Sequence, residues 1–385
     1  MGQIRLQPAF THLLLKIKKD QSTKRGSIID TITEEEHKDK PRSNSFLRIN
    51  SAIKVKDKLY HCTDYNFNIF ELEALVKDKL MEVVTNHLFA KIGLFSNELL
   101  KEDSLADFAK EISNGYNNVP YHNYIHAVDV TQTSFMIVTS GKLIENLDLL
   151  DLDLMSLLIG AMCHDYKHNG FNNMYHENTL SDIAIDSNDI SILESYHARE
   201  SFKVILKHNL LANLDKPSFK IFRKRFIECL MATDMANHTN HLNQLKNKMT
   251  LFDIKKGENV SMLKSNDKTL FDNQQQILNL CIHGSDVSNP TKPYIVYKKW
   301  VGLIFEEFFN QGDLEKQAGL PITVLCDREN TSIPKSQIGF ITYVVRPTFD
   351  LLKELCPKVQ PYCDNISLNL DLYEEIVSES QKKMN

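Results

Sequence analysis

The sequence contains few of the residues that interrupt regular structure. Only 13 glycines and 11 prolines occur in 385 residues, which disfavours a turn-rich β-sandwich and is typical of a protein built from long helices. No signal segment opens the chain, and no run of about 18 uncharged apolar residues is present that could cross a bilayer. The seven cysteines include no CxxC pair, which argues against a disulfide framework and favours a reducing compartment. We therefore expect a cytoplasmic protein without a transmembrane segment.

Excess positive charge is confined to the N-terminal region. The net charge is −5, yet residues 1–60 hold 13 Lys/Arg against 7 Asp/Glu, so the remainder of the chain carries −11. A polyanion would not be attracted to that larger part, and nucleic-acid binding is therefore not expected as its function.

Residues 1–60 are predicted to form a mobile basic leader with a regulatory role. Residues 20–58 are polar and show no sustained apolar period. Before them, residues 7–19 form the short basic amphipathic stretch QPAFTHLLLKIKK. Two interpretations stay open for this stretch: a helix that docks on the protein's own surface, or a contact with calmodulin, another regulator or a membrane.

Residues 61–385 are predicted to form one compact all-α domain. From Tyr65 onward, apolar residues recur at spacings of three and four, and most prolines fall between these runs. The polar segment 243–273 is predicted as an excursion between helices. No internal repeat of fixed period is present.

A small set of histidines and aspartates in apolar surroundings predicts a metal centre. His122 and His126 lie in YHNYIHAVDV, His164 and Asp165 in MCHDYKHNG, and Asp286 in GSDVSNPTKP. A buried carboxylate costs folding free energy unless a cation compensates its charge. Imidazole and carboxylate groups bind divalent metals that activate water. On a helix, His122 and His126 would lie one turn apart and face one cleft. One could then bind metal while the other moves a proton.

Five motifs occur together in an order that resembles a known family. YHNxxHAxDVxQ, HDYxHxG, ATDM, DxSNPTKP and SQxGF resemble the signature series of the class I cyclic nucleotide phosphodiesterases, over about residues 65–349. HDYKHNG and the stretch before SQIGF are most similar to the calmodulin-dependent subfamily. The resemblance implies a multi-helix HD-type phosphodiesterase catalytic domain.

The resemblance also implies a two-metal site. The positions that match the ligands of a tight zinc-like site are His126, His164, Asp165 and Asp286. Asp165 also matches the bridge to a second metal, usually magnesium or manganese. The positions that match the residues holding that metal's waters are His168, Glu194, His197 and Thr233. A hydroxide activated by both metals would attack phosphorus.

Catalytic acid and base-binding positions follow from the same resemblance. His122 matches the general acid that protonates the departing 3′ oxygen. Glu307 matches the carboxylate behind it, with the neighbouring Glu306 as the alternative. The substrate-binding positions are Tyr121, Asn289, Ile304, Gln337 and Phe340.

The base-binding positions carry two conflicting indications of substrate. Gln337 matches the purine anchor, and Phe340 and Ile304 match the two halves of a base clamp; without the resemblance, both would be predicted as core. Asn289 favours adenine because its amide can donate to a ring nitrogen and accept from the exocyclic amine. Similarity to the calmodulin-dependent subfamily implies use of both cyclic nucleotides.

We favour hydrolysis of cAMP to the 5′-monophosphate, with use of cGMP left open. The alternatives are an HD-type phosphohydrolase acting on non-cyclic nucleotides and a catalytically silent cyclic nucleotide binder.

Overall fold

The computed structural model describes residues 52–96, 99–264 and 267–384. Within these ranges the chain is helical and contains no strand, only an isolated antiparallel bridge between Lys255 and Glu258. The predicted all-α fold class is therefore confirmed. The basic stretch 7–19 lies outside the described residues, so its role stays a prediction.

The helices follow one another with short connections. Those of the first half are α3 (Ile69–Val76), α4 (Leu80–Lys91), α5 (Glu102–Gly115), α6 (Tyr124–Thr139), α7 (Leu143–Leu147), α8 (Asp151–Cys163), α9 (Asn173–Asn178), α10 (Asp182–Ser187) and α11 (Ile192–Lys207). Those of the second half are α12 (Lys216–Met231), α13 (His238–Leu251), α14 (Asp267–Asp286), α15 (Tyr294–Gln317), α16 (Ile333–Phe340), α17 (Arg346–Leu355) and α18 (Gln360–Met384). The 3₁₀ turns are η1 (His61–Thr63), η2 (Lys77–Lys79), η3 (Met235–Asn237), η4 (Val260–Lys264), η5 (Asn289–Thr291) and η7 (Pro357–Val359), and η6 (Ile341–Val345) is a π-helix.

Two helices, α6 and α8, form the centre of the core. Every residue of 126–138 in α6 and of 153–163 in α8 is buried, so both helices are enclosed on all sides. α6 packs against α4, α8 and α14, and α8 packs against α12. This enclosure by neighbouring helices fixes the ends of α6 and α8, where His126, His164 and Asp165 lie.

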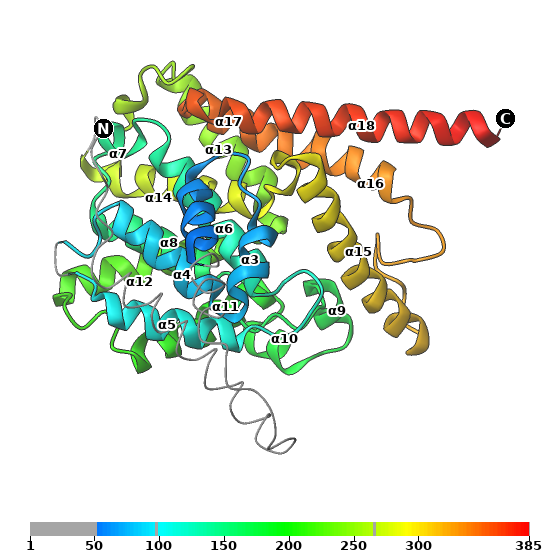
Figure 1. Ribbon diagram of the computed structural model, residues 1–385, viewed down its shortest axis with the longest axis horizontal. Coiled ribbons are helices and arrows are strands. Elements are labelled where there is room, and N and C mark those ends of the chain that lie inside the picture. The colour runs from blue at the N-terminus through cyan, green and yellow to red at the C-terminus, as the bar shows by residue number, and fades with distance from the viewer. Residues whose placement is uncertain (1–51, 97–98, 265–266, 385) are drawn as a thin grey trace, which may run out of the picture.

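The C-terminal helices lie along one side of this core. α15 begins near α18 and runs away from it (Figure 1). α18 lies along one edge of the molecule and extends past the rest of the fold (Figure 1). α16 continues without a break into η6 and α17. This arrangement brings residues from the last third of the chain next to the ends of α6, α8 and α14.

Two features bear on the predicted boundaries. Val55 and Leu59 are already part of the hydrophobic core, so within the described residues packing begins before position 61; the boundary of the leader itself stays a prediction. The polar segment 243–273 was predicted too long as an excursion, because α13 reaches Leu251 and α14 begins at Asp267.

The structure also bears on the predictions about membranes and cysteines. All seven cysteines are free. Among the described helices, none has both the length and the apolar character needed to cross a bilayer.

Candidate active site

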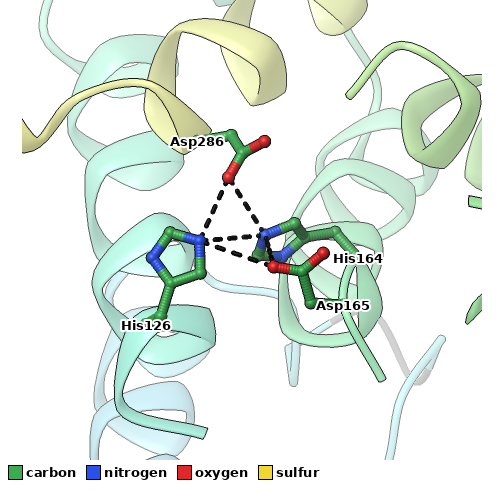
Figure 2. A group of neighbouring side chains, drawn as sticks. All are labelled: His126, His164, Asp165 and Asp286. Carbon is green, nitrogen blue, oxygen red and sulfur yellow. Dashed lines mark hydrogen bonds and ion pairs between the residues drawn. The ribbon is translucent and has the colours of Figure 1, made fainter. Parts of the chain in front are cut away.

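Four predicted ligands meet where three buried helices end. His126 lies in the first turn of α6, which Asn123 caps by accepting the Ile125 N–H. His164 and Asp165 follow the last residue of α8, and Asp286 is the last residue of α14. Figure 2 shows the four side chains pointing at one another from these three elements.

Their donor atoms form a compact cluster. His126 Nε2 lies 3.1 Å from Asp286 Oδ1 and 3.6 Å from Asp165 Oδ2. His164 Nε2 lies 3.3 Å from His126 Nε2, 3.0 Å from Asp165 Oδ2 and 3.3 Å from Asp286 Oδ1. A tetrahedral ion with nitrogen and oxygen ligands at about 2.0–2.1 Å holds those ligand atoms about 3.3–3.4 Å apart. The cluster therefore fits a divalent metal ion.

The charges of the cluster also require a cation. Burial alone lowers the pKa of His164, but Asp165 and Asp286 raise it well above its usual value. Burial likewise raises the pKa of Asp286, yet His164 and His126 hold it far below the ordinary range. The protein thus stabilises positive charge at this point, and a divalent ion would displace the proton that His164 otherwise carries.

His122 lies next to this cluster but is not part of α6. The prediction that His122 and His126 lie one turn apart on a helix is wrong, because α6 begins at Tyr124 and His122 precedes the cap residue. The segment before the helix still brings the rings together, with centroids 5.9 Å apart. His122 can therefore face the substrate while His126 faces the metal cluster.

Glu307, not Glu306, is the partner of His122. Glu307 Oε1 makes a short contact with His122 Nδ1, and Glu307 Oε2 accepts the backbone N–H groups of Tyr121 and His122 at 2.9 and 3.1 Å. Glu306 is exposed. Burial lowers the pKa of His122, but the Glu307 carboxylate outweighs it and raises that pKa to about 9. The ring is therefore cationic at neutral pH, as a general acid must be.

His168 is held in the neutral form beside this cation. Its ring stacks on His122 with centroids 4.0 Å apart, and its Nδ1 accepts the Gly170 N–H at 3.0 Å. Burial lowers the pKa of His168, and the charge on His122 lowers it further. An imidazole whose Nδ1 accepts carries its proton on Nε2, so His168 offers a donor on its other side.

His197 has an unused acceptor directed at the cluster. His197 Nδ1 donates to the Tyr166 carbonyl at 2.6 Å. Its Nε2 lies 3.8 Å from Asp165 Oδ1, is buried and has no hydrogen-bond partner. Burial lowers the pKa of His197 to about 4, so the ring is neutral and Nε2 presents a lone pair. A water held between His197 and Asp165 would satisfy that atom.

The other two predicted water-holding residues are less directly connected. Glu194 is contacted by Asn173 Nδ2 at 3.1 Å, and burial together with Asp234 raises its pKa to about 7. Thr233 is buried and donates its hydroxyl to the Leu230 carbonyl at 2.8 Å. Their role toward a second metal stays a prediction.

The predicted base-binding residues are oriented by two tyrosines. The Tyr297 hydroxyl donates to Gln337 Oε1 at 2.6 Å, and Asn289 Nδ2 donates to the Tyr121 hydroxyl in a short hydrogen bond. These contacts leave Gln337 Nε2 as a donor and Asn289 Oδ1 as an acceptor.

The two residues of the predicted base clamp retain exposed surface. Phe340 and Ile304 are only half-buried and pack against the core on one side. Each therefore has a face that a ligand could cover.

Three supporting residues were not predicted. Tyr297 lies in an apolar stripe of α15, and its partner Gln337 is 40 residues away. Lys292 and Asp129 form a fully buried ion pair at 2.8 Å, with Lys292 also donating to Thr133. A charge inside the apolar run IHAVDV and another in SNPTKP were the signals for this pair, because buried charges need partners.

Comparisons with known proteins agree with this geometry. The family model described as 3′5′-cyclic nucleotide phosphodiesterase matches residues 121–366. The probable 3′,5′-cyclic-AMP phosphodiesterase pde-4 of Caenorhabditis elegans is 36% identical over 337 residues, which cover 86% of this chain and 48% of that protein. The human dual specificity calcium/calmodulin-dependent 3′,5′-cyclic nucleotide phosphodiesterase 1B is 34% identical over 306 residues, 78% of this chain and 54% of that protein.

A solved structure supports the same assignment. The phosphodiesterase domain of the RhoPDE fusion protein from the choanoflagellate Salpingoeca rosetta superposes with a TM-score of 0.74 at 29% identity, covering 83% of this chain and 97% of that domain. The chain spans about half the length of the curated relatives it matches. A matching family model over most of the chain, together with these relatives, shows that the chain belongs to the 3′,5′-cyclic nucleotide phosphodiesterase family.

Proposed function

We propose that this protein hydrolyses the 3′ ester of cAMP to give 5′-AMP. The observation that carries the proposal is the position of the cationic His122 beside a cluster that fits a metal, with Asn289 hydrogen-bonded to the adjacent Tyr121.

The metal cluster would supply the nucleophile. We assign His126, His164, Asp165 and Asp286 to a zinc ion, and Asp165 with the waters of His168, Glu194, His197 and Thr233 to a magnesium or manganese ion. Such a pair of cations supplies Lewis acidity toward the phosphate and a hydroxide near neutral pH. The lone pair of His197 Nε2 and the donor of His168 fix the positions of the solvent on that side.

His122 would complete the reaction by proton transfer. The ring is held by Glu307 with its Nδ1 turned toward the carboxylate, so Nε2–H remains to protonate the departing 3′ oxygen. A cationic donor strengthens as negative charge develops on that oxygen, which lowers the energy of the transition state.

Adenine fits the hydrogen-bonding pattern of the pocket. Adenine presents an amine donor beside a ring-nitrogen acceptor, whereas guanine presents a carbonyl acceptor beside an N–H donor. Gln337 Nε2 can donate to the adenine ring nitrogen, and Asn289 Oδ1 can accept from the exocyclic amine. Guanine would leave Asn289 Oδ1 facing an acceptor, which costs binding energy in a buried site.

A direct comparison of substrates tests the assignment. The purified protein is assayed with magnesium and cAMP, cGMP, dATP or a nucleoside monophosphate, and product release is measured for each. We expect cAMP to be hydrolysed fastest by kcat/KM. Turnover of dATP or of the monoester with both cyclic nucleotides untouched would reject the proposal, and binding of cAMP without turnover would indicate a silent binder.

Control through the N-terminal stretch is a separate proposal. Residues 7–19 are basic and amphipathic, a composition suited to calmodulin or to an anionic membrane surface. Rates measured with and without calcium and calmodulin, for the full chain and for the chain lacking residues 1–50, test it, because this cut keeps the core residues Val55 and Leu59. A cytoplasmic location likewise stays a prediction.

A further inference from the structure

A second cavity lies outside the candidate active site, between α13 and the segment formed by η6 and α17. Its volume is about 660 Å³, within the range of sites that hold small molecules. We call it the α13–α17 groove; its walls include Lys246, Tyr343, Arg346, Asp350 and Lys353. α13 and α17 pack against each other, so the groove has rigid walls.

The groove contains cationic side chains without ionic partners. Lys246, Arg346 and Lys353 make no ion pair with any residue in the part of the chain that the structure describes. Arg346 donates weakly to Ser367 Oγ at 3.4 Å, and its buried Nε has no hydrogen-bond partner. The buried Nε is closed to a ligand, so an acceptor in the groove would contact the exposed part of Arg346 and the ammonium groups of the two lysines.

The acidic residues of the groove do not cancel this charge. The Glu354 carboxylate lines the groove and also accepts the backbone N–H of Lys256 at 2.7 Å, and it keeps its negative charge. Asp350 is exposed. Three cations against two carboxylates leave the groove with a net charge of +1, and a phosphate group is the ligand that arginine and lysine together bind best.

A solvent-exposed aromatic ring lines the groove together with these cations. Tyr343 has 76% of its surface exposed, although aromatic rings on a folded surface are usually covered in part. A planar base of any identity can stack on such a ring. A ring beside a cluster of cations therefore suits a molecule that carries both a base and a phosphate.

The position of Tyr343 also points to a functional surface. Thr342 and Tyr343 belong to the π-helix η6, which directly follows Phe340 of the predicted base clamp. π-helical turns are uncommon and occur frequently at functional sites. The opposite wall contains His238, whose Nδ1 lies 2.8 Å from Nε2 of His283, one turn before Asp286. A ligand in the groove would thus touch segments that border the active site.

We propose that the α13–α17 groove binds a nucleoside phosphate, with Arg346, Lys353 and Lys246 on the phosphate and Tyr343 against the base. This is a site separate from the metal cluster. It requires no turnover, so it does not depend on the reaction proposed above.

Equilibrium dialysis of the full chain with labelled AMP tests the proposal. We expect two AMP molecules per chain, one in the active site and one in the groove. Tyr343→Ala and Lys246→Gln should each weaken one of the two sites by about tenfold or more. Both residues are exposed, so neither change should unfold the protein. The control Lys298→Gln removes an exposed lysine of α15 that does not line the groove and should keep both sites.

Further ligands and one further variant separate the possible sources of binding. Orthophosphate alone and adenosine alone should each bind the groove at least about tenfold more weakly than AMP, because each lacks one half of the contacts. Gln337→Ala should affect only the active site. A single AMP per chain that Gln337→Ala abolishes would overturn the proposal. So would groove binding that is insensitive to Tyr343→Ala, or equally strong binding of orthophosphate. Loss of AMP from the groove in the groove variants would stand whether or not cAMP is hydrolysed, and the comparison of substrates described above decides the reaction separately.

Discussion

Replacement of Glu307 by glutamine gives the sharpest test of the proton-transfer role of His122. Glutamine keeps the shape of the side chain and an oxygen that can accept the N–H groups of Tyr121 and His122, which Glu307 now accepts at 2.9 and 3.1 Å. It removes the negative charge. In the native protein, burial lowers the pKa of His122 but Glu307 raises it to about 9. Without that carboxylate, burial should lower the pKa of His122.

The expected size of the effect follows from the protonated fraction. At pH 7.5, an imidazole with a pKa of about 9 is about 97% protonated. If the pKa falls to 6.5 or below, about 10% or less is protonated at the same pH. The rate of cAMP hydrolysis at pH 7.5 should therefore fall, by about tenfold if the pKa returns to its ordinary value, and the alkaline limb of the pH–rate profile should move from about 9 to lower pH.

The assay is kcat against pH for cAMP, for the native protein and the Glu307→Gln variant. Activity of Glu307→Gln should recover in part toward pH 6, because His122 regains its proton. His122→Ala has no acid to recover and should lose about 10²–10⁴-fold at every pH. Glu306→Gln is the matched control, since Glu306 is the exposed neighbour, and it should behave as the native protein. An unshifted alkaline limb in Glu307→Gln would refute the reasoning.

Three further predictions concern stability, base selection and pH. Lys292→Met leaves Asp129 as an uncompensated buried charge and should cost about 3–5 kcal/mol of unfolding free energy; a urea midpoint equal to that of the native protein would contradict it. Asn289→Ala should lower kcat/KM for cAMP more than for cGMP, since only adenine offers its amine to this amide; an unchanged ratio would show that Asn289 does not select the base. The raised pKa of His122 means that the ion pair with Glu307 contributes its full stability below pH 6.5 and loses it as pH rises through about 9; thermal melts across pH 6–10 that show no such loss would count against the pair.

The sequence was sufficient for the helical class and for the set of four side chains that the structure brings together. Apolar residues at helical spacing predicted the enclosed helices, and charged residues inside such runs pointed to the site. These candidate ligands come from positions 126, 164, 165 and 286, and only their motifs, not their spacing along the chain, indicated that they meet.

Other features depended on tertiary contacts that a sequence does not display. The start of α6 was misplaced because Asn123, a capping residue, lies between the two histidines. Glu306 and Glu307 are neighbours, and only the rotation of α15 decides which one is buried against His122. Most of α13 was predicted as part of the polar excursion 243–273, because its many polar residues hid Leu242, Leu245 and Met249, the buried face of a helix that is otherwise solvated.

The central claim is that four side chains from three helix ends hold a divalent metal. Elemental analysis by mass spectrometry of the pure, active protein tests it most directly, with Asp286→Ala alongside and the exposed Asp371→Ala as control. We expect about one tightly held transition-metal ion per chain in the native protein and in Asp371→Ala, and its loss in Asp286→Ala. Active native protein that contains no such metal would contradict the account.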